Sequence, residues 1–141
     1  MDTPPRMSLT RVLIVDDNEM FIEMSRFVLT AAANTVETAA DAAEAMLKIP
    51  IFRPDVILMD IQMPVMDGIE LTRRLKADPA TKHIIIVAFT AYAVKGDELG
   101  LRAAGFDGYI GKPVDILTLG AAVRFWLDGP PSARASHFVW P

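Results

Sequence analysis

The amino-acid sequence predicts an α/β fold, in which a five-stranded parallel sheet is covered by five helices on both faces. Short runs rich in Val, Ile and Leu recur along the chain, and stretches of helical length separate them. This alternation is typical of parallel strands joined by right-handed crossovers. The 141 residues, 52% of them hydrophobic, fit one domain with a full core.

Five short apolar runs are the expected strands. The run before Asp60 is short, rich in Val and Ile and followed by a proline loop, which indicates a strand buried on both faces. The run before Thr90 has the strongest strand signal of the chain. The expected strands are residues 11–15, 35–38, 56–59, 84–89 and 108–110.

Helices are expected between these strands and after the last one. Asn18 and Asp41 can cap the first two, and the segment 50–54, with a proline at each end, is expected to break the chain before the third strand. The fourth helix contains Gly96 and Gly100, each about 1 kcal/mol less favourable than alanine, and should be the least stable. The expected helices are residues 18–32, 41–49, 67–77, 94–104 and 115–127.

Composition excludes several classes of protein. The net charge of -4 and the pI near 5.1 argue against a nucleic-acid binder, and the lack of cysteine excludes disulfides and thiolate metal sites. No run approaches the roughly 20 apolar residues of a membrane span. We therefore expect a soluble cytoplasmic protein without a membrane partner. Its expected parts are a flexible arm at 1–8, one domain at 9–128 and a Pro-containing tail at 129–141.

Reactive side chains follow four of the expected strands. Asp16 and Asp17 follow the first, Asp60 the third, Thr90 the fourth and Lys112 the fifth. The carboxyl ends of parallel strands share one edge, so three carboxylates should converge there. Such carboxylates repel one another unless a cation is present, and a hard divalent ion such as Mg²⁺ suits them. With a lysine and a hydroxyl beside them, they predict a pocket for phosphoryl transfer.

These positions lie in motifs that resemble the receiver domains of two-component response regulators. The motifs are VLIVDD, ILMDIQMPVMDG, AFTA and YIGKP, and the resemblance spans about residues 9–128. It implies the CheY-like, flavodoxin-like fold with strand order 2-1-3-4-5. The segment AYAVKGDE further resembles DivK-like single-domain regulators and the receivers of hybrid kinases.

The resemblance implies a role for each acidic position. Asp60 would be the phosphoacceptor. Asp17, Asp60 and the backbone carbonyl of Gln62 would bind Mg²⁺, with Asp16 acting largely through water.

It also implies how the phosphoryl group is read. Lys112 would hold a phosphoryl oxygen, and Thr90 would close onto the group once it arrives. Tyr109 matches an aromatic switch whose ring turns inward as Thr90 moves, although a half-buried core aromatic is an equal alternative.

A histidine kinase or a histidine phosphotransfer protein would donate the phosphoryl group, and output is expected through protein contacts with an unknown target. On the first helix, the stripe of Met20, Met24, Phe27, Val28 and Ala31 is expected to face the core. The partner surface is then expected on the opposite side, at Ile22, Arg26 and Leu29.

A second candidate surface lies on the fifth helix, where Phe125 and Trp126 lie off the expected core stripe. A homodimer through this helix and the tail is one expectation. The alternative is that Phe138 and Trp140 of the tail cover Phe125.

Three functions are compatible with this site. The first is a stand-alone phospho-acceptor switch, and the second is a relay shuttle that passes the phosphoryl group to another phosphotransfer protein. The third, a small Mg²⁺-dependent aspartyl-phosphate hydrolase, would need a second aspartate where Gln62 stands. A flavin-binding domain is disfavoured, because the acidic end of the first strand would repel a phosphate.

Overall fold

The computed structural model describes residues 10–31, 34–63, 65–90 and 98–111. The expected fifth helix and the tail lie outside these residues, as do Lys112, Phe125 and Trp126. Within the described part of the chain, no helix is both long enough and apolar enough to span a bilayer.

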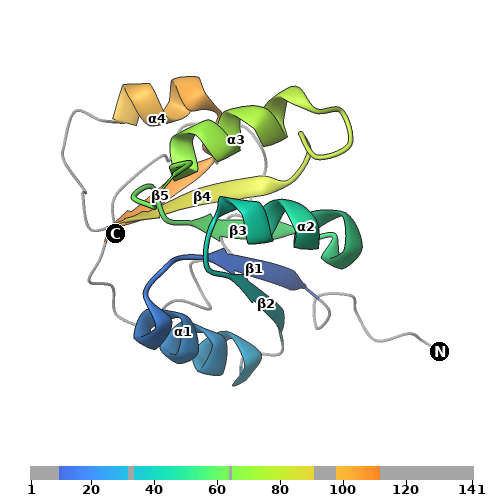
Figure 1. Ribbon diagram of the computed structural model, residues 1–141, viewed down its shortest axis with the longest axis vertical. Coiled ribbons are helices and arrows are strands. Elements are labelled where there is room, and N and C mark those ends of the chain that lie inside the picture. The colour runs from blue at the N-terminus through green and yellow to red at the C-terminus, as the bar shows by residue number, and fades with distance from the viewer. Residues whose placement is uncertain (1–9, 32–33, 64, 91–97, 112–141) are drawn as a thin grey trace.

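A five-stranded parallel sheet forms the centre of the molecule (Figure 1). The strand order is β2-β1-β3-β4-β5, which confirms the predicted order. Val15 pairs with both Ala39 and Met59, so the first three strands end at one edge. The strands are β1 (Arg11–Val15), β2 (Thr35–Ala39), β3 (Val56–Met59), β4 (Ile85–Thr90) and β5 (Gly108–Gly111).

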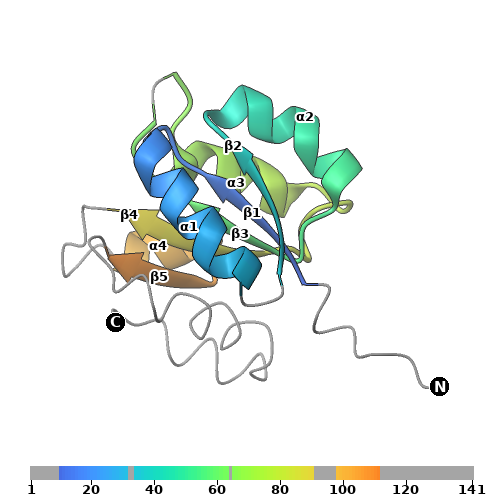
Figure 2. The same ribbon diagram turned by 90° about the horizontal axis from the view of Figure 1, so that it is seen from below.

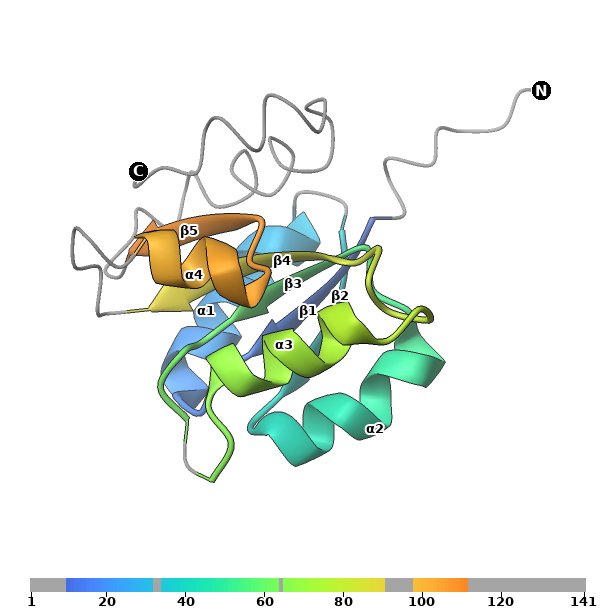
Figure 3. The same cartoon turned by 90° about the horizontal axis from the view of Figure 1, so that it is seen from above.

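The described helices cover both faces of this sheet. Helices α2, α3 and α4 lie on one face, as Figure 3 shows, and α1 crosses the other face, as Figure 2 shows. Alternate strand residues face opposite sides, so β1 and β3 contribute to two separate cores, for example Leu13 to one and Ile14 to the other. The helices are α1 (Glu19–Ala31), α2 (Ala42–Phe52), α3 (Gly68–Ala77) and α4 (Glu98–Ala104).

The orientation of α1 is the reverse of the one predicted. Ile22 and Leu29 are buried against the sheet together with Ser25, whereas Met20 is 73% and Phe27 is 76% exposed. Both stripes of this helix contain large apolar residues, so helical spacing alone did not distinguish them. Ser25 lies in the buried stripe, between Ile22 and Leu29, and is fully buried.

The prediction of a partner surface on α1 is therefore wrong for two of its three residues. Ile22 and Leu29 belong to the core beneath the helix, and neither is accessible to another protein. Arg26 is exposed, as predicted, and donates a hydrogen bond to Thr38 Oγ1 over 3.2 Å. The exposed apolar side chains of α1 are Met20, Met24 and Phe27 instead.

Helix α2 also differs from its prediction, because it continues through Pro50 to Phe52. Pro50 lies in the last two turns with its ring exposed, so it removes one backbone donor without ending the helix. Arg53 then caps the helix in the left-handed conformation, and its N–H donates to the Ile49 carbonyl. Arg11 stabilises this end, since its Nε donates to the Phe52 carbonyl over 2.7 Å and its guanidinium stacks on the Phe52 ring.

Candidate functional site

Asp16 and Asp60 are positioned by the sheet itself. Each directly follows the last residue of its strand, and its backbone N–H still donates a hydrogen bond to the neighbouring strand. The Asp16 N–H donates to the Ala39 carbonyl over 3.0 Å, and the Asp60 N–H donates to the Val15 carbonyl over 2.9 Å. The two aspartates are therefore held side by side at the carboxyl edge.

The predicted cluster of three carboxylates is present at this edge. Asp16, Asp17 and Asp60 each offer an oxygen within 4.8 Å of the others. Asp16 is 1% and Asp60 is 6% exposed, while Asp17 faces solvent. Two buried like charges this close repel one another, and a cation coordinated by hard oxygen ligands would relieve the repulsion. Three carboxylates at one edge are a donor set that suits Mg²⁺.

Backbone amides hold the two buried carboxylates in place. Asp16 Oδ1 accepts the Asn18 N–H over 2.9 Å, and Asp60 Oδ1 accepts the Gln62 N–H over 3.1 Å. Asn18 is itself fixed, because its Oδ1 accepts the Phe21 N–H at the start of α1. These bonds limit rotation of the carboxylates, which favours a preformed site. The predicted role of the Gln62 carbonyl stays a prediction.

Gly68 is part of the site, although the sequence indicated it only as the start of a helix. A Cβ at this position would lie 2.2 Å from the Asp60 carbonyl oxygen and 2.9 Å from Met59 Cγ. The Gly68 N–H also donates to the Ile61 carbonyl over 2.9 Å. Helix α3 therefore begins directly against the backbone of Asp60. The sequence did hold one signal for this role. Gly68 directly follows the helix cap Asp67, at a position where residues that favour helix are preferred over glycine.

The register of β4 and β5 brings further predicted residues to the same edge. Thr90 is the last residue of β4 and pairs with Gly111, the last residue of β5. The backbone of Tyr109 pairs with Ala88. Lys112 follows Gly111 in the chain and lies outside the described residues. The side-chain roles of Thr90, Tyr109 and Lys112 stay predictions.

Known proteins are similar to this chain in sequence and in architecture. A family model for the response regulator receiver domain matches residues 12–124. The polar-differentiation response regulator DivK of Brucella anthropi is 40% identical over 105 residues, which cover 74% of this chain and 85% of that protein.

Two solved structures extend the comparison. The chemotaxis response regulator CheY4 of Vibrio cholerae has a TM-score of 0.79 at 32% identity, covering 84% of this chain and 98% of that one. A CheY-like receiver domain protein of Methanospirillum hungatei has a TM-score of 0.78 at 32% identity, with coverages of 85% and 94%. The residues that the family model matches include all three aspartates of the acidic cluster.

Proposed function

The chain belongs to the family of response regulator receiver domains, and we propose that it works as a stand-alone phospho-acceptor switch of a two-component system. Receiver domains pair with histidine kinases, and they are phospho-acceptor signalling proteins rather than true enzymes. The observation that carries the proposal is the buried Asp60 beside Asp16 and Asp17. The stand-alone role is supported by the similarity to DivK, of which 85% is covered.

In the proposed reaction, a carboxylate oxygen of Asp60 attacks the phosphorus of a phosphohistidine on the donor protein. A P–O bond forms, the P–N bond breaks, and the electron pair remains on the imidazole nitrogen, which takes a proton from solvent. Asp60 becomes an acyl phosphate. The bonds to the Gln62 N–H and to the Val15 carbonyl hold Asp60 in place during this step.

Mg²⁺ is the proposed cofactor. Asp17 and Asp60 would hold it directly and Asp16 largely through water, with the Gln62 carbonyl completing the protein ligands. Bound there, the ion supplies positive charge beside the phosphoryl oxygens. The three carboxylates otherwise oppose the approach of an anionic phosphoryl group, so phosphorylation should require a divalent cation.

Lys112 and Thr90 are proposed to respond to the new charge. Thr90 ends β4 at the edge where Asp60 lies, and Lys112 directly follows Gly111, the last residue of β5, in the sequence. Lys112 would pair with a phosphoryl oxygen, and the Thr90 hydroxyl would donate to another. Tyr109, a residue of β5, would then change its packing, which would carry the signal towards α4.

The phosphoryl donor is proposed to dock on the exposed face of α1, which begins beside the acidic cluster. Met20, Met24 and Phe27 are large apolar side chains exposed to solvent on this helix. Such a group marks an interaction surface. It takes the place of the surface predicted at Ile22 and Leu29, which are buried.

Phosphorylation in vitro tests the proposal. The protein should be labelled by acetyl phosphate or by a phosphorylated histidine kinase in the presence of Mg²⁺, and labelling should be lost when EDTA is added. Asp60→Asn should abolish labelling, whereas Asp78→Asn, which changes an exposed aspartate at the far end of α3, should retain it. Labelling of the Asp60→Asn variant at the wild-type rate would contradict the assignment.

A chase separates the switch from the relay shuttle. The phosphorylated protein is mixed with a histidine phosphotransfer protein, and a shuttle should transfer its phosphoryl group within seconds. The hydrolase alternative is not supported, because Gln62 stands where a second aspartate would act as the general acid.

A further inference from the structure

Strand β2 comes first in the strand order and pairs with β1 on one side, so its other side is an edge of the sheet. On the inner side, the Thr35 N–H donates a hydrogen bond to the Thr10 carbonyl over 2.7 Å. The backbone N–H and C=O groups of successive strand residues point to alternate sides, so those of Val36 and Thr38 point outward. Outward groups of this kind are where a strand of another molecule can pair.

Charged side chains occupy both outward backbone groups of Thr38. The Thr38 carbonyl accepts a hydrogen bond from the Lys48 ammonium over 2.6 Å, and the Thr38 N–H donates to Glu37 Oε1 over 3.1 Å. Arg26 of α1 contacts the same residue, because its Nη2 donates to the Thr38 hydroxyl over 3.2 Å. Side chains from α1, from α2 and from β2 itself therefore meet at this one residue of the edge.

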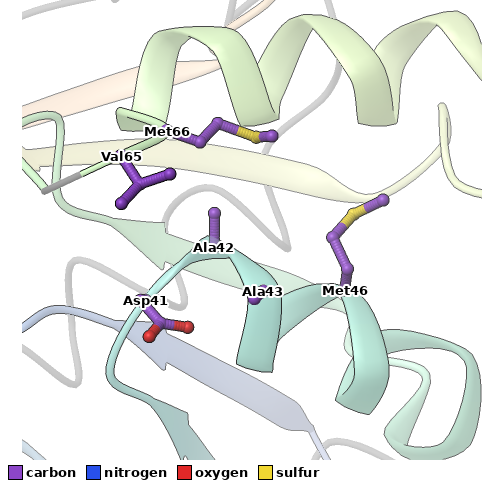
Figure 4. Close-up of a pocket in the computed structure, with 6 residues that line it drawn as sticks. All are labelled: Asp41, Ala42, Ala43, Met46, Val65 and Met66. Carbon is purple, nitrogen blue, oxygen red and sulfur yellow. The ribbon is translucent and has the colours of Figure 1, made fainter.

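A tight turn between β2 and α2 places Lys48 over the edge. Asp41 caps the helix, and its Oδ1 accepts the Glu44 N–H over 2.8 Å. Figure 4 shows Asp41 where the chain enters α2, beside a pocket of about 200 Å³. Glu44 accepts the Ala40 N–H over 2.8 Å and pairs with Lys48 over 2.9 Å. Since residues four apart lie on the same side of a helix, this turn directs Lys48 back to the strand before it.

Lys48 approaches the strand more closely than it approaches either carboxylate. Its Nζ lies 2.6 Å from the Thr38 carbonyl oxygen, 2.9 Å from Glu44 and 3.4 Å from Glu37. The side chains of Lys48, Glu44 and Glu37 are 32%, 41% and 43% exposed, and ion pairs this exposed contribute little to stability. The close approach to the carbonyl is therefore better explained by protection of the edge than by stability.

We propose that Lys48 protects the β2 edge from pairing with a strand of another molecule. A strand that approached this edge would have to displace the ammonium from the Thr38 carbonyl and would bring an apolar or like-charged surface against it. If two copies of this chain paired through β2, their two Lys48 side chains would also repel one another. A signalling protein selects its partners at defined surfaces, and an open strand edge would add an unselective one.

Removal of the ammonium tests the proposal with the full-length protein alone. Lys48→Met keeps a side chain of similar length without a donor, which leaves the Thr38 carbonyl available at the edge. In sedimentation equilibrium at concentrations up to about 1 mM, this variant should associate with a dissociation constant at least about tenfold below that of the wild type. Lys48→Arg keeps a charged donor and should behave like the wild type.

Hydrogen exchange followed by NMR identifies the surface that associates. In Lys48→Met, the outward Val36 amide should exchange about threefold or more slowly at about 1 mM than at about 0.1 mM, because strand pairing gives it an acceptor. Amides of α3, which does not border β2, should exchange at rates independent of concentration. Association of the variant that leaves the Val36 amide unprotected would assign the contact to another surface and would overturn the proposal.

Lys76→Met is the matched control for a loss of stability. It removes a lysine at the end of α3 that donates to the Ile84 carbonyl over 2.7 Å and pairs with Asp107 over 2.9 Å, and it leaves β2 unchanged. This variant should associate no more strongly than the wild type. Equal association of both methionine variants would attribute the effect to destabilisation rather than to the edge. That result, or a Lys48→Met variant that associates no more than the wild type, would contradict the protective role.

Discussion

At the carboxyl edge of the sheet, Asp16, Asp17 and Asp60 gather three like charges within 4.8 Å, whereas at the amino edge Lys76 and Asp107 form an ion pair over 2.9 Å. Like charges in proximity reduce the stability of the folded chain, and paired charges with satisfied hydrogen bonds contribute to it. The difference separates a part of the molecule shaped for binding from a part shaped for stability.

The amino edge satisfies its charges through several elements. Lys76 Nζ, at the end of α3, also donates to the Ile84 carbonyl over 2.7 Å and to the Lys82 carbonyl over 3.2 Å. Asp107 Oδ2 accepts the Ile86 N–H in addition to Lys76. This network ties the end of α3 to the starts of β4 and β5.

Helix α3 joins the two edges, because it starts against the Asp60 carbonyl and ends at Lys76. Substitutions at its two ends therefore test whether the edges have separate roles.

The largest effect is expected from Gly68→Ala at the carboxyl edge. The new methyl group would lie 2.2 Å from a backbone oxygen, so α3 must shift, at a cost of about 3 kcal/mol in the free energy of unfolding and with loss of phosphorylation. Urea denaturation and acetyl phosphate labelling measure these effects. Gly100→Ala on α4 is the matched control, since its Cβ meets nothing within 4 Å, and it should raise stability by about 0.5–1 kcal/mol.

Lys76→Met tests the amino edge. It keeps the aliphatic stem but removes the ammonium that pairs with Asp107 and donates to two carbonyl oxygens, so the free energy of unfolding should fall by about 2 kcal/mol. Asp107 then keeps only the Ile86 N–H as a donor. Under conditions in which the variant is still folded, its Mg²⁺-dependent phosphorylation should persist. A variant that remains folded but loses phosphorylation would show that the amino edge also controls the site.

Removal of Mg²⁺ tests the carboxyl edge without any change in packing. Saturating Mg²⁺ should stabilise the wild-type protein by about 1–3 kcal/mol, because the ion binds the folded chain and relieves the repulsion. Asp17→Asn removes one carboxylate from an exposed position of the cluster. In this variant most of the stabilisation by Mg²⁺ should disappear. Thermal melts with Mg²⁺ and with EDTA measure both. An undiminished Mg²⁺ shift in the variant would exclude Asp17 as a ligand.

The smallest effect concerns an exposed charge pair on α2. The Ala40 N–H and the Lys48 ammonium lower the pKa of Glu44 below its ordinary value of 4.5. A lowered pKa contributes stability above pH 4.5 that is lost as the pH falls through the folded-state pKa. The side chain is 41% exposed, so the contribution should be only about 0.5 kcal/mol.

Glu44→Gln checks this contribution. The variant should be slightly less stable than the wild type at pH 7, and the two should converge as the pH falls to about 3. A constant difference across this range would assign the effect to packing rather than to charge.

The positions of Asp16 and Asp60 followed directly from the sequence. A carboxylate at the end of an apolar run reaches the sheet edge in any parallel arrangement, and the order of the strands brought the two together as expected. Gly68 could not be recognised in the same way, since its requirement comes from the Asp60 carbonyl, eight residues earlier in the chain.

Local periodicity was sufficient for the strands and for the existence of four helices, because these depend on residues close together in the sequence. The acidic edge also depended on the order of the strands, since β1 and β3 bring Asp16 and Asp60 together. The tertiary structure decided which stripe of α1 is buried, since Ile22 and Leu29 fit the sheet while Met20 and Phe27 do not reach it. It also decided where α2 ends, because Arg11 of strand β1 contacts Phe52, the last residue of this helix. Both outcomes depend on contacts between distant residues, which spacing along the chain does not contain.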